Sequence, residues 1–234
     1  MRRTFGAKLP LFLASGCAIS SLKFWTSGLR SLVTDLVGWS SYIYARAFLV
    51  SVGMRAGTSR EVAIGYDLRD SSPDIAATVA AAAAAAGFEA INCGLLPTPA
   101  LVLEAKRRGC CAVMVTGSHI PEDRNGLKFY RSDGEITKVD EAAIAAALGE
   151  VTKPDTPPPS VPARPEPDAI KRYRHRYRNV FAPDALMGLR IAVYQQSSGA
   201  RDVLSDLLTG FGAQVVPIGR SDKLVPIDTE AHRP

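Results

Sequence analysis

The sequence predicts an α/β fold in which a mostly parallel sheet carries helices on both faces. The first indication is that strand-like and helix-like segments alternate along the chain. The second is that the strand segments, such as EVAIGYD and CCAVMVTG, are continuous apolar runs without polar–apolar alternation. Strands covered by helices on both faces have this pattern. We therefore expect ligands to bind beyond the carboxyl ends of these strands.

The first elements follow from local patterns. The segment LKFWTSGLRSLV starts like a strand and runs into a loop that contains Thr26, Ser27 and Arg30. The segment SSYIYARAFLVSVG predicts a helix, because its apolar residues recur on one face and Gly53 can end it. The apolar run EVAIGYD predicts a buried strand after it.

The next elements repeat the alternation of helix and strand. The helix SSPDIAATVAAAAAAAG has Ser72 as its expected cap and Pro73 in its first turn. Its alanine run is an excellent helix former of small volume, so we expect close packing against a sheet. The strand FEAINCG, the helix TPALVLEAKRRG, the strand CCAVMVTG and the helix VDEAAIAAALGEV follow in that order.

The chain is predicted to contain two units built on one plan. The segment LRIAVYQQSSGARDVLSDLLTGFGAQVVPIG repeats the strand–helix–strand order of the earlier segment that starts with EVAIGYD. A proline-rich stretch between them predicts an extended linker. The expected divisions are an N-terminal extension (1–20), a first domain (21–153), the linker (154–168), and a connecting helix with the beginning of a second domain (169–234).

Composition and charge exclude several classes of protein. The four cysteines (Cys17, Cys93, Cys110 and Cys111) lack metal or redox spacing and are too few for a disulfide scaffold. We therefore expect a reducing compartment, the cytoplasm. The N-terminal segment MRRTFGAKLPLFLASGC fits a signal peptide poorly, and no other stretch is apolar enough to span a membrane. No membrane association is expected.

The basic segment AIKRYRHRYRNVF has two interpretations. Cations interleaved with aromatic residues suit nucleic acid. An amphipathic helix that turns Ile170, Tyr173, Tyr177 and Val180 inward, with its cations in solvent, explains the same residues. The second interpretation is favoured; the net charge of +5 suits anionic small molecules as well as nucleic acid and decides little. No nucleic-acid partner is expected.

The turn VTGSHIPEDRNGLKF is the strongest candidate for a functional site. Ser118 offers a nucleophilic hydroxyl, His119 an acid or base, and Lys128 a mobile positive charge. Gly117 and Gly126 allow the backbone to approach a ligand closely. The hydrolase Gly-x-Ser-x-Gly elbow, the Walker loop and the Gly-x-Gly-x-x-Gly pattern do not match. Spacing alone indicates an anion-handling loop with a nucleophile, with a plain polar turn as the alternative.

Four motifs in the same order resemble those of the α-D-phosphohexomutases, the phosphomannomutase and phosphoglucomutase family. KFWTSGLRSLV resembles the opening Phe-Gly-Thr-Ser-Gly-Leu-Arg-Gly loop of the family, and IGYDLRDSSP resembles its Gly-x-Asp-x-Arg-x-Ser-Ser-Pro step. GLLPTPAL resembles the Leu-x-Pro-Thr-Pro step. VTGSHIPEDRNGLKF resembles the active-site loop, Thr-Ala-Ser-His-Asn-Pro followed by Asn-Gly-x-Lys. The resemblance covers about residues 22–234.

The resemblance implies a reaction and a set of roles. Ser118 would carry a phosphoryl group, give it to a hexose phosphate and take back the other phosphate, so that hexose 6-phosphate and hexose 1-phosphate interconvert. Mg²⁺, bound in part by the phosphoserine oxygen of Ser118, and a hexose 1,6-bisphosphate activator would be required; no obligate protein partner is implied. The implied catalytic residues are Ser118, His119, Lys128 and Arg30, and the implied phosphate-binding residues are Thr26, Ser27, Gly117 and Asn125.

The sequence also departs from the family pattern. Trp25 and Ser31 stand where the family has glycines, and Gly117 and Ile120 replace an alanine and an asparagine. The metal loop Asp-Gly-Asp-x-Asp-Arg does not occur in the 234 residues. We therefore expect the chain to be the N-terminal part of a mutase and inactive in turnover by itself. The alternative is a non-catalytic phosphosugar-binding remnant of the family.

Overall fold

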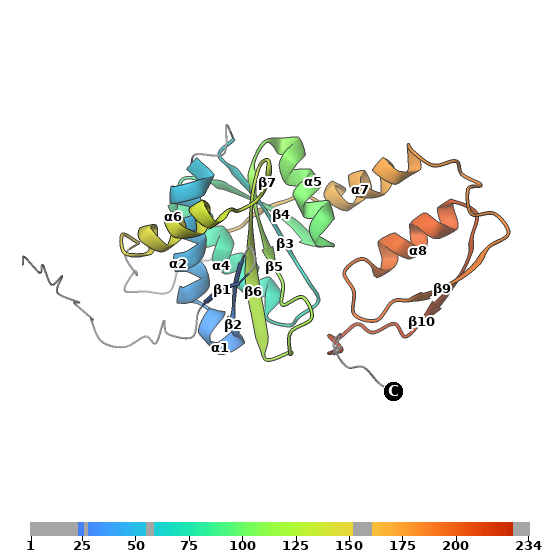
Figure 1. The fold of residues 1–234 in the computed structure, drawn as a ribbon, viewed down its shortest axis with the longest axis horizontal. Coiled ribbons are helices and arrows are strands. Elements are labelled where there is room, and N and C mark those ends of the chain that lie inside the picture. The colour runs from blue at the N-terminus through green and yellow to red at the C-terminus, as the bar shows by residue number, and fades with distance from the viewer. Residues whose placement is uncertain (1–22, 26–27, 55–58, 152–160, 227–234) are drawn as a thin grey trace, which may run out of the picture.

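A central sheet organises the first two thirds of the chain (Figure 1). The computed structural model describes residues 23–25, 28–54, 59–151 and 161–226. Among them, eight strands form a sheet of order β1-β2-β6-β5-β3-β4-β8, with β7 beside β6. The strands are β1 (Lys23–Trp25), β2 (Gly28–Leu32), β3 (Glu61–Tyr66), β4 (Glu89–Leu95), β5 (Cys111–Val115), β6 (Arg124–Arg131), β7 (Gly134–Glu135) and β8 (Arg164–Pro165).

The predicted α/β class is confirmed, and the sheet is mixed in direction. Strands β5, β3, β4 and β8 run parallel to one another. Strands β1, β2, β6 and β5 are paired antiparallel. The connection from β5 to β6 explains the change, because parallel neighbours need a crossover of about a dozen residues or more and the segment 116–123 is too short.

Helices cover both faces of this sheet, as predicted (Figure 1). One face carries α1 (Val33–Leu36), α2 (Trp39–Phe48), the π-helical turn η2 (Leu49–Gly53), α4 (Ser72–Ala85) and α6 (Lys138–Leu148). The other face carries α5 (Thr98–Arg108) and α7 (Asp168–Arg178).

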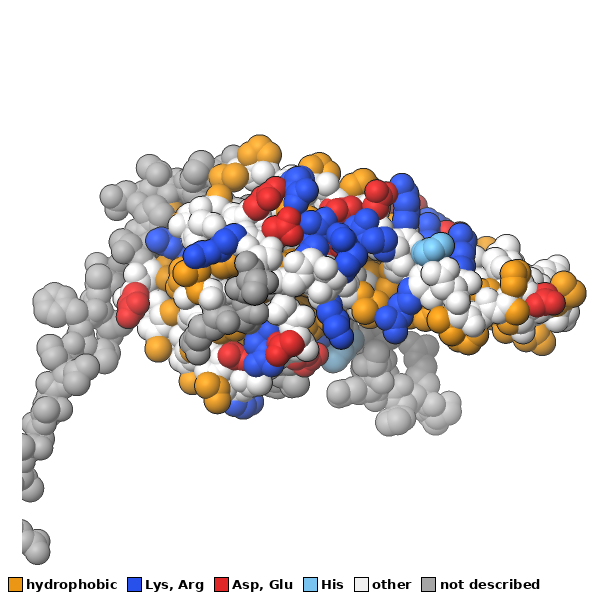
Figure 2. Space-filling model, turned by 90° about the horizontal axis from the view of Figure 1, so that it is seen from above, with side chains coloured by type: hydrophobic (Ala, Val, Ile, Leu, Met, Phe, Trp, Pro, Cys, Tyr) orange, Lys and Arg blue, Asp and Glu red, His pale blue; other side chains and the backbone are white. Residues whose placement is uncertain are grey.

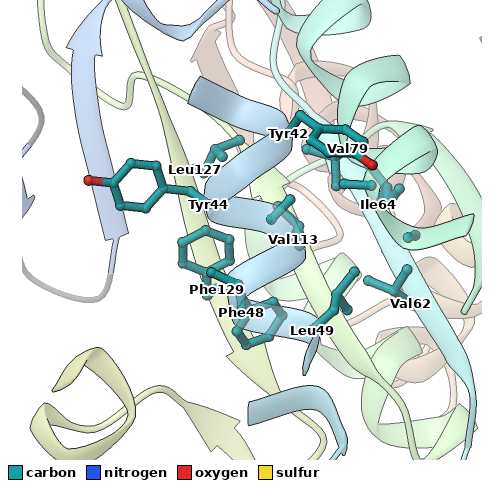
Figure 3. Packing of buried hydrophobic residues seen from close by; sticks show 14 of the residues in the cluster. Tyr42, Tyr44, Phe48, Leu49, Val62, Ile64, Val79, Val113, Leu127 and Phe129 are labelled. Carbon is teal, nitrogen blue, oxygen red and sulfur yellow. The ribbon is translucent and has the colours of Figure 1, made fainter. Parts of the chain in front are cut away.

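The larger core lies between the sheet and the first group of helices. Figure 3 shows side chains of α2 and η2 packed against residues of β3, β5 and β6. Phe48 and Phe129 stack with ring centroids 4.7 Å apart, and neither is exposed. The alanine-rich helix α4 lies close to α2, which the small side chains allow. This packing fixes the strand ends from which the site residues project.

A second, smaller unit follows α7. Its strands β9 (Arg190–Tyr194) and β10 (Gln214–Ile218) are parallel and are joined through α8 (Arg201–Gly210). The repeated strand–helix–strand order is thus confirmed, since β3, α4 and β4 are arranged in the same way. Gly87 and Gly212 end the two helices with φ of 77° and 89°, a conformation that favours glycine. The predicted domain boundaries stay a prediction.

Parts of the predicted linker and basic helix differ from expectation. Within 154–168, β8 pairs with β4 as an edge strand and is not a free tether. In α7, Ile170, Tyr173 and Tyr177 pack inward as predicted. Val180 is 72% exposed, so its predicted inward position is wrong, because the helix ends at Arg178. Figure 2 shows Lys and Arg gathered on the face seen from above, partly beside Asp and Glu.

Arginines of α5 and α7 form an ionic network around the buried Glu104. The carboxylate of Glu104, 3% exposed, accepts hydrogen bonds from Arg107 (2.6 Å), Arg108 (2.7 Å) and Arg172 (2.9 Å). Arg108 and Arg172 also form ion pairs with Glu166. Burial acts to raise the pKa of Glu104, but the hydrogen bonds from the arginines outweigh it and lower the pKa to about 2.

Candidate active site

The predicted site lies at the carboxyl ends of the parallel strands, beside a cavity of about 490 Å³. The loops after β3, β4 and β5 form one wall of this cavity, and the turn between β9 and α8 forms the opposite wall. Its lining includes Asp67, Arg69, Thr98, Thr116, Ser118 and His119 on one side and Gln196, Ser197, Ser198 and Gly199 on the other. The cavity therefore combines residues of both units.

The segment 116–123, which we call the serine loop, places Ser118 at the cavity. β5 ends at Val115, and both Ser118 and His119 are exposed. The Ser118 Oγ lies 3.4 Å from His119 Nδ1. Ser118 has φ of 56°, in the left-handed region that non-glycine residues rarely adopt. A hydroxyl with a neighbouring imidazole is a suitable arrangement for accepting or releasing a group with proton transfer.

Asp67, just after β3, holds the start of the serine loop. Its Oδ2 accepts hydrogen bonds from the Thr116 hydroxyl (2.8 Å) and the Gly117 amide (3.2 Å). The Thr116 hydroxyl in turn accepts from the Ser118 amide at 2.9 Å. The Asp67 Oδ1 accepts from the Ser72 hydroxyl at 2.6 Å. The predicted cap role of Ser72 is therefore wrong: α4 begins at Ser72, and its hydroxyl bonds Asp67 rather than the helix amides.

The cations Arg30 and Lys128 lie on the face of the sheet that carries Met114, a cavity residue. Arg30 is paired with Gly126 in the β2–β6 register, and Lys128 is paired with Met114 in the β5–β6 register. Both side chains are partly exposed. Successive side chains of a strand point to opposite faces, and the Leu127 and Phe129 side chains are in the core on the other face. The sheet thus places both cations on the same face as Met114, although neither of them is among the residues that line the cavity.

Asn125 and Gly126 do not form the turn that the Asn-Gly pair suggested; both lie within β6. Asn125 is completely buried, and its amide donates to the hydroxyls of Ser71 and Ser72 at 2.9 Å. The side chain therefore supports the loops from behind the cavity. A Cβ on Gly126 would lie 2.6 Å from the Leu29 carbonyl oxygen, so strand packing alone requires glycine here.

The remaining site residues of the sequence prediction fall into two groups. Gly117 is buried, with a Cβ position only 2.3 Å from the guanidinium of Arg69. Thr26 and Ser27 lie outside the described residues, as does the predicted extension 1–20. Their predicted contacts with phosphate stay predictions.

Arg69 lies at the site but was not among the residues predicted from the sequence. It is 3% exposed and lies beneath the serine loop. Burial lowers the pKa of Arg69 from its ordinary value, while Asp67 acts in the opposite direction. The signal available in the sequence was the Asp-x-Arg pair directly after the buried strand EVAIGY. Gln196, across the cavity, is a second addition and also has a left-handed φ, 47°.

A Mg²⁺ site needs several oxygen ligands close together. Within the described ranges, no three His, Cys, Asp or Glu side chains gather in a way that could hold a metal ion. Asp67, the carboxylate nearest to Ser118 in the lining, already accepts hydrogen bonds on both oxygens. These residues therefore do not form a Mg²⁺ site by themselves.

The sequence that forms the sheet and the serine loop matches a known protein family. The family model described as phosphoglucomutase/phosphomannomutase, alpha/beta/alpha domain I, matches residues 21–155. The chain belongs to the phosphoglucomutase/phosphomannomutase family. A phosphomannomutase of Sinorhizobium fredii is 49% identical over 216 residues, which are 89% of this chain and 45% of that protein. A phosphomannomutase of Salmonella muenchen is 41% identical over 212 residues, or 91% of this chain and 43% of that protein.

More distant members of the family share the fold. A phosphoglucosamine mutase of Erwinia tasmaniensis is 30% identical over 201 residues, 84% of this chain and 45% of that protein. The crystal structure of a phosphoglucomutase/phosphomannomutase family protein from Burkholderia thailandensis superposes with a TM-score of 0.69 at 20% identity, covering 86% of this chain and 44% of that one. The chain thus spans less than half the length of these relatives. In the described residues no helix has the length and apolar character needed to cross a membrane.

Proposed function

We propose that Ser118 is the phosphoryl carrier of a phosphohexomutase that interconverts hexose 6-phosphate and hexose 1-phosphate. The observation that carries the proposal is the exposed Ser118 at the carboxyl end of β5, beside His119 and a cavity lined by both units. Arg30 and Lys128 supply positive charge on the same face of the sheet, which suits an anionic phosphoryl group. Mannose phosphate is the proposed substrate, since the two most similar relatives cited are phosphomannomutases.

The reaction divides into two transfers. The phosphoserine oxygen–phosphorus bond breaks as a hydroxyl of the hexose monophosphate attacks, which yields a hexose 1,6-bisphosphate and free Ser118. The sugar then turns around, and the Ser118 hydroxyl attacks the other phosphate. His119 takes up the Ser118 hydroxyl proton, the positive charge of Lys128 stabilises the sugar oxygen as its bond to phosphorus breaks, and that oxygen regains a proton as the hexose monophosphate leaves as the isomer. Mg²⁺ and a hexose 1,6-bisphosphate activator belong to the proposal through the family resemblance, as does the cytoplasmic location.

The proposal is tested by incubating the 234-residue chain with Mg²⁺ and a hexose 1,6-bisphosphate. We expect the intact mass to increase by one phosphoryl group, peptide mapping to place it on Ser118, and hexose monophosphate to appear in equal amount. The rival function, a phosphosugar-binding remnant, predicts weak binding of the sugar without any gain of mass. A folded chain that binds the sugar and stays unphosphorylated would contradict the proposal.

A further inference from the structure

Arg69 donates hydrogen bonds to four backbone carbonyls, three in the serine loop and one at the start of β6. Its Nη1 donates to the carbonyl oxygens of Pro121 (2.8 Å) and Arg124 (2.9 Å). Its Nη2 donates to those of Ile120 (2.6 Å) and Ser118 (3.4 Å). These partners are about fifty residues away in the sequence. A single planar guanidinium therefore holds the loop from its first exposed residue to the start of β6.

This arrangement retains a buried charge with incomplete pairing. Arg69 is 3% exposed, and the nearest carboxylate contact is from its Nε to Asp67 Oδ2 at 3.4 Å. The Nε has no hydrogen-bond partner among the described atoms. Burying a charge in this way is unfavourable unless its contacts are needed. The hydrogen bonds to the loop carbonyls offset the cost of burying the charge of Arg69. We infer from this that Arg69 maintains the conformation of the loop.

The direction of these carbonyls matters for an anion at Ser118. A phosphoserine carries a charge of about −1.5 to −2 at neutral pH, and carbonyl oxygens facing it would repel it. The carbonyl oxygens of Ser118, Ile120 and Pro121 are directed at the Arg69 guanidinium, whose positive charge offsets their partial negative charge next to Ser118. Ser118, one of these partners, has the left-handed φ of 56°.

Gly117 makes room for this guanidinium. A Cβ added at Gly117 would lie 2.3 Å from both Cζ and Nε of Arg69, closer than atoms can approach without movement. The φ of Gly117 is not in the left-handed region, so backbone freedom is not the reason for glycine here. In this chain the absence of a Cβ leaves that space to the Arg69 guanidinium.

We propose that Arg69 is a positioning residue that orients Ser118 for phosphoryl transfer. The proposal rests on the proposed function of Ser118. It concerns the loop conformation, however, which can be measured without any reaction.

The test compares Arg69→Lys with the unchanged chain. Lysine keeps the charge but cannot reach four carbonyls with one ammonium group. We expect amide hydrogen exchange in residues 117–124 to become about 10- to 100-fold faster in the unphosphorylated protein. We expect the maximal rate of Ser118 phosphorylation by hexose 1,6-bisphosphate to fall about 100-fold, with little change in the half-saturating concentration.

Arg108→Lys is the matched control, because Arg108 is also a multiply bonded, largely buried arginine but lies in the Glu104 network. It should leave loop exchange and the phosphorylation rate unchanged, even if it lowers the melting temperature as much as Arg69→Lys does. Unchanged loop exchange in Arg69→Lys, or equal loss of phosphorylation in Arg108→Lys, would overturn the proposal. If the unchanged chain takes up no phosphate, the proposed function fails while the exchange comparison still decides the role of Arg69.

Discussion

Replacing Ser118 with alanine is expected to reduce phosphate incorporation from hexose 1,6-bisphosphate by at least about 10³-fold, because the atom that forms the bond to phosphorus is removed. The fold should not change. The Ser118 side chain is exposed, and its hydroxyl has one contact among the described residues, to His119 at 3.4 Å. Surface substitutions of this kind change the free energy of unfolding by about 0.5 kcal/mol or less. The measurement is quantitative mass spectrometry beside a urea unfolding curve.

Ser198→Ala is the matched control for this experiment. Ser198 is also exposed and lines the same cavity, but from the opposite wall. It should keep the ability of the chain to take up one phosphate. Phosphate incorporation that survives in Ser118→Ala would show that another residue is the acceptor, and the assignment of Ser118 would be abandoned.

Replacing Glu104 with alanine is expected to lower the free energy of unfolding by about 3–5 kcal/mol. The substitution leaves Arg107, Arg108 and Arg172 close together without the carboxylate that all three contact. It also removes the ionic link between α5 and α7. Urea unfolding at neutral pH measures the loss. Asp133→Ala serves as the control. The Asp133 side chain pairs with Arg131 but is 69% exposed, and an exposed ion pair contributes about 1 kcal/mol or less to the free energy of unfolding.

The same carboxylate gives the stability a defined pH dependence. The pKa of Glu104 is lowered from an ordinary 4.5 to about 2 in the folded chain. The stabilisation is therefore complete above about pH 4.5, where the unfolded chain is also ionised, and is lost as the pH falls through about 2. The shift corresponds to about 3 kcal/mol. Glu104→Gln should be less stable at neutral pH and should lose less stability on acidification than the unchanged chain. Parallel pH profiles of the two proteins would contradict this assignment.

The order of elements was predictable because it depends on local pattern. Apolar runs, helix periodicity and glycines past the helix ends gave β3, α4, β4, α5 and β5 nearly at their observed bounds. The position of Ser118 just beyond β5 followed from the same reading, since the apolar run ends at Val115.

What could not be predicted depends on contacts between residues far apart in the sequence. Asn-Gly at 125–126 is a typical turn pair, yet Asn125 is satisfied by Ser71 and Ser72, and Gly126 is required by the nearby Leu29 carbonyl. Arg69 stands in a loop where a charged residue is ordinary. Its role follows only from the serine loop folding over it. The pairing of β5 with β6, which makes the sheet mixed, likewise arises from a connection too short for a parallel crossover.

The central claim is that this serine loop transfers phosphoryl groups in a phosphohexomutase. The most direct test is a chimaera in which the matching 216-residue segment of the Sinorhizobium fredii phosphomannomutase is replaced by the corresponding residues of this chain. The measurement is the rate of conversion of mannose 1-phosphate to mannose 6-phosphate. We predict steady turnover that Ser118→Ala lowers by about 10⁴-fold or more. A folded chimaera whose turnover is absent, or is the same with and without Ser118, would contradict the claim.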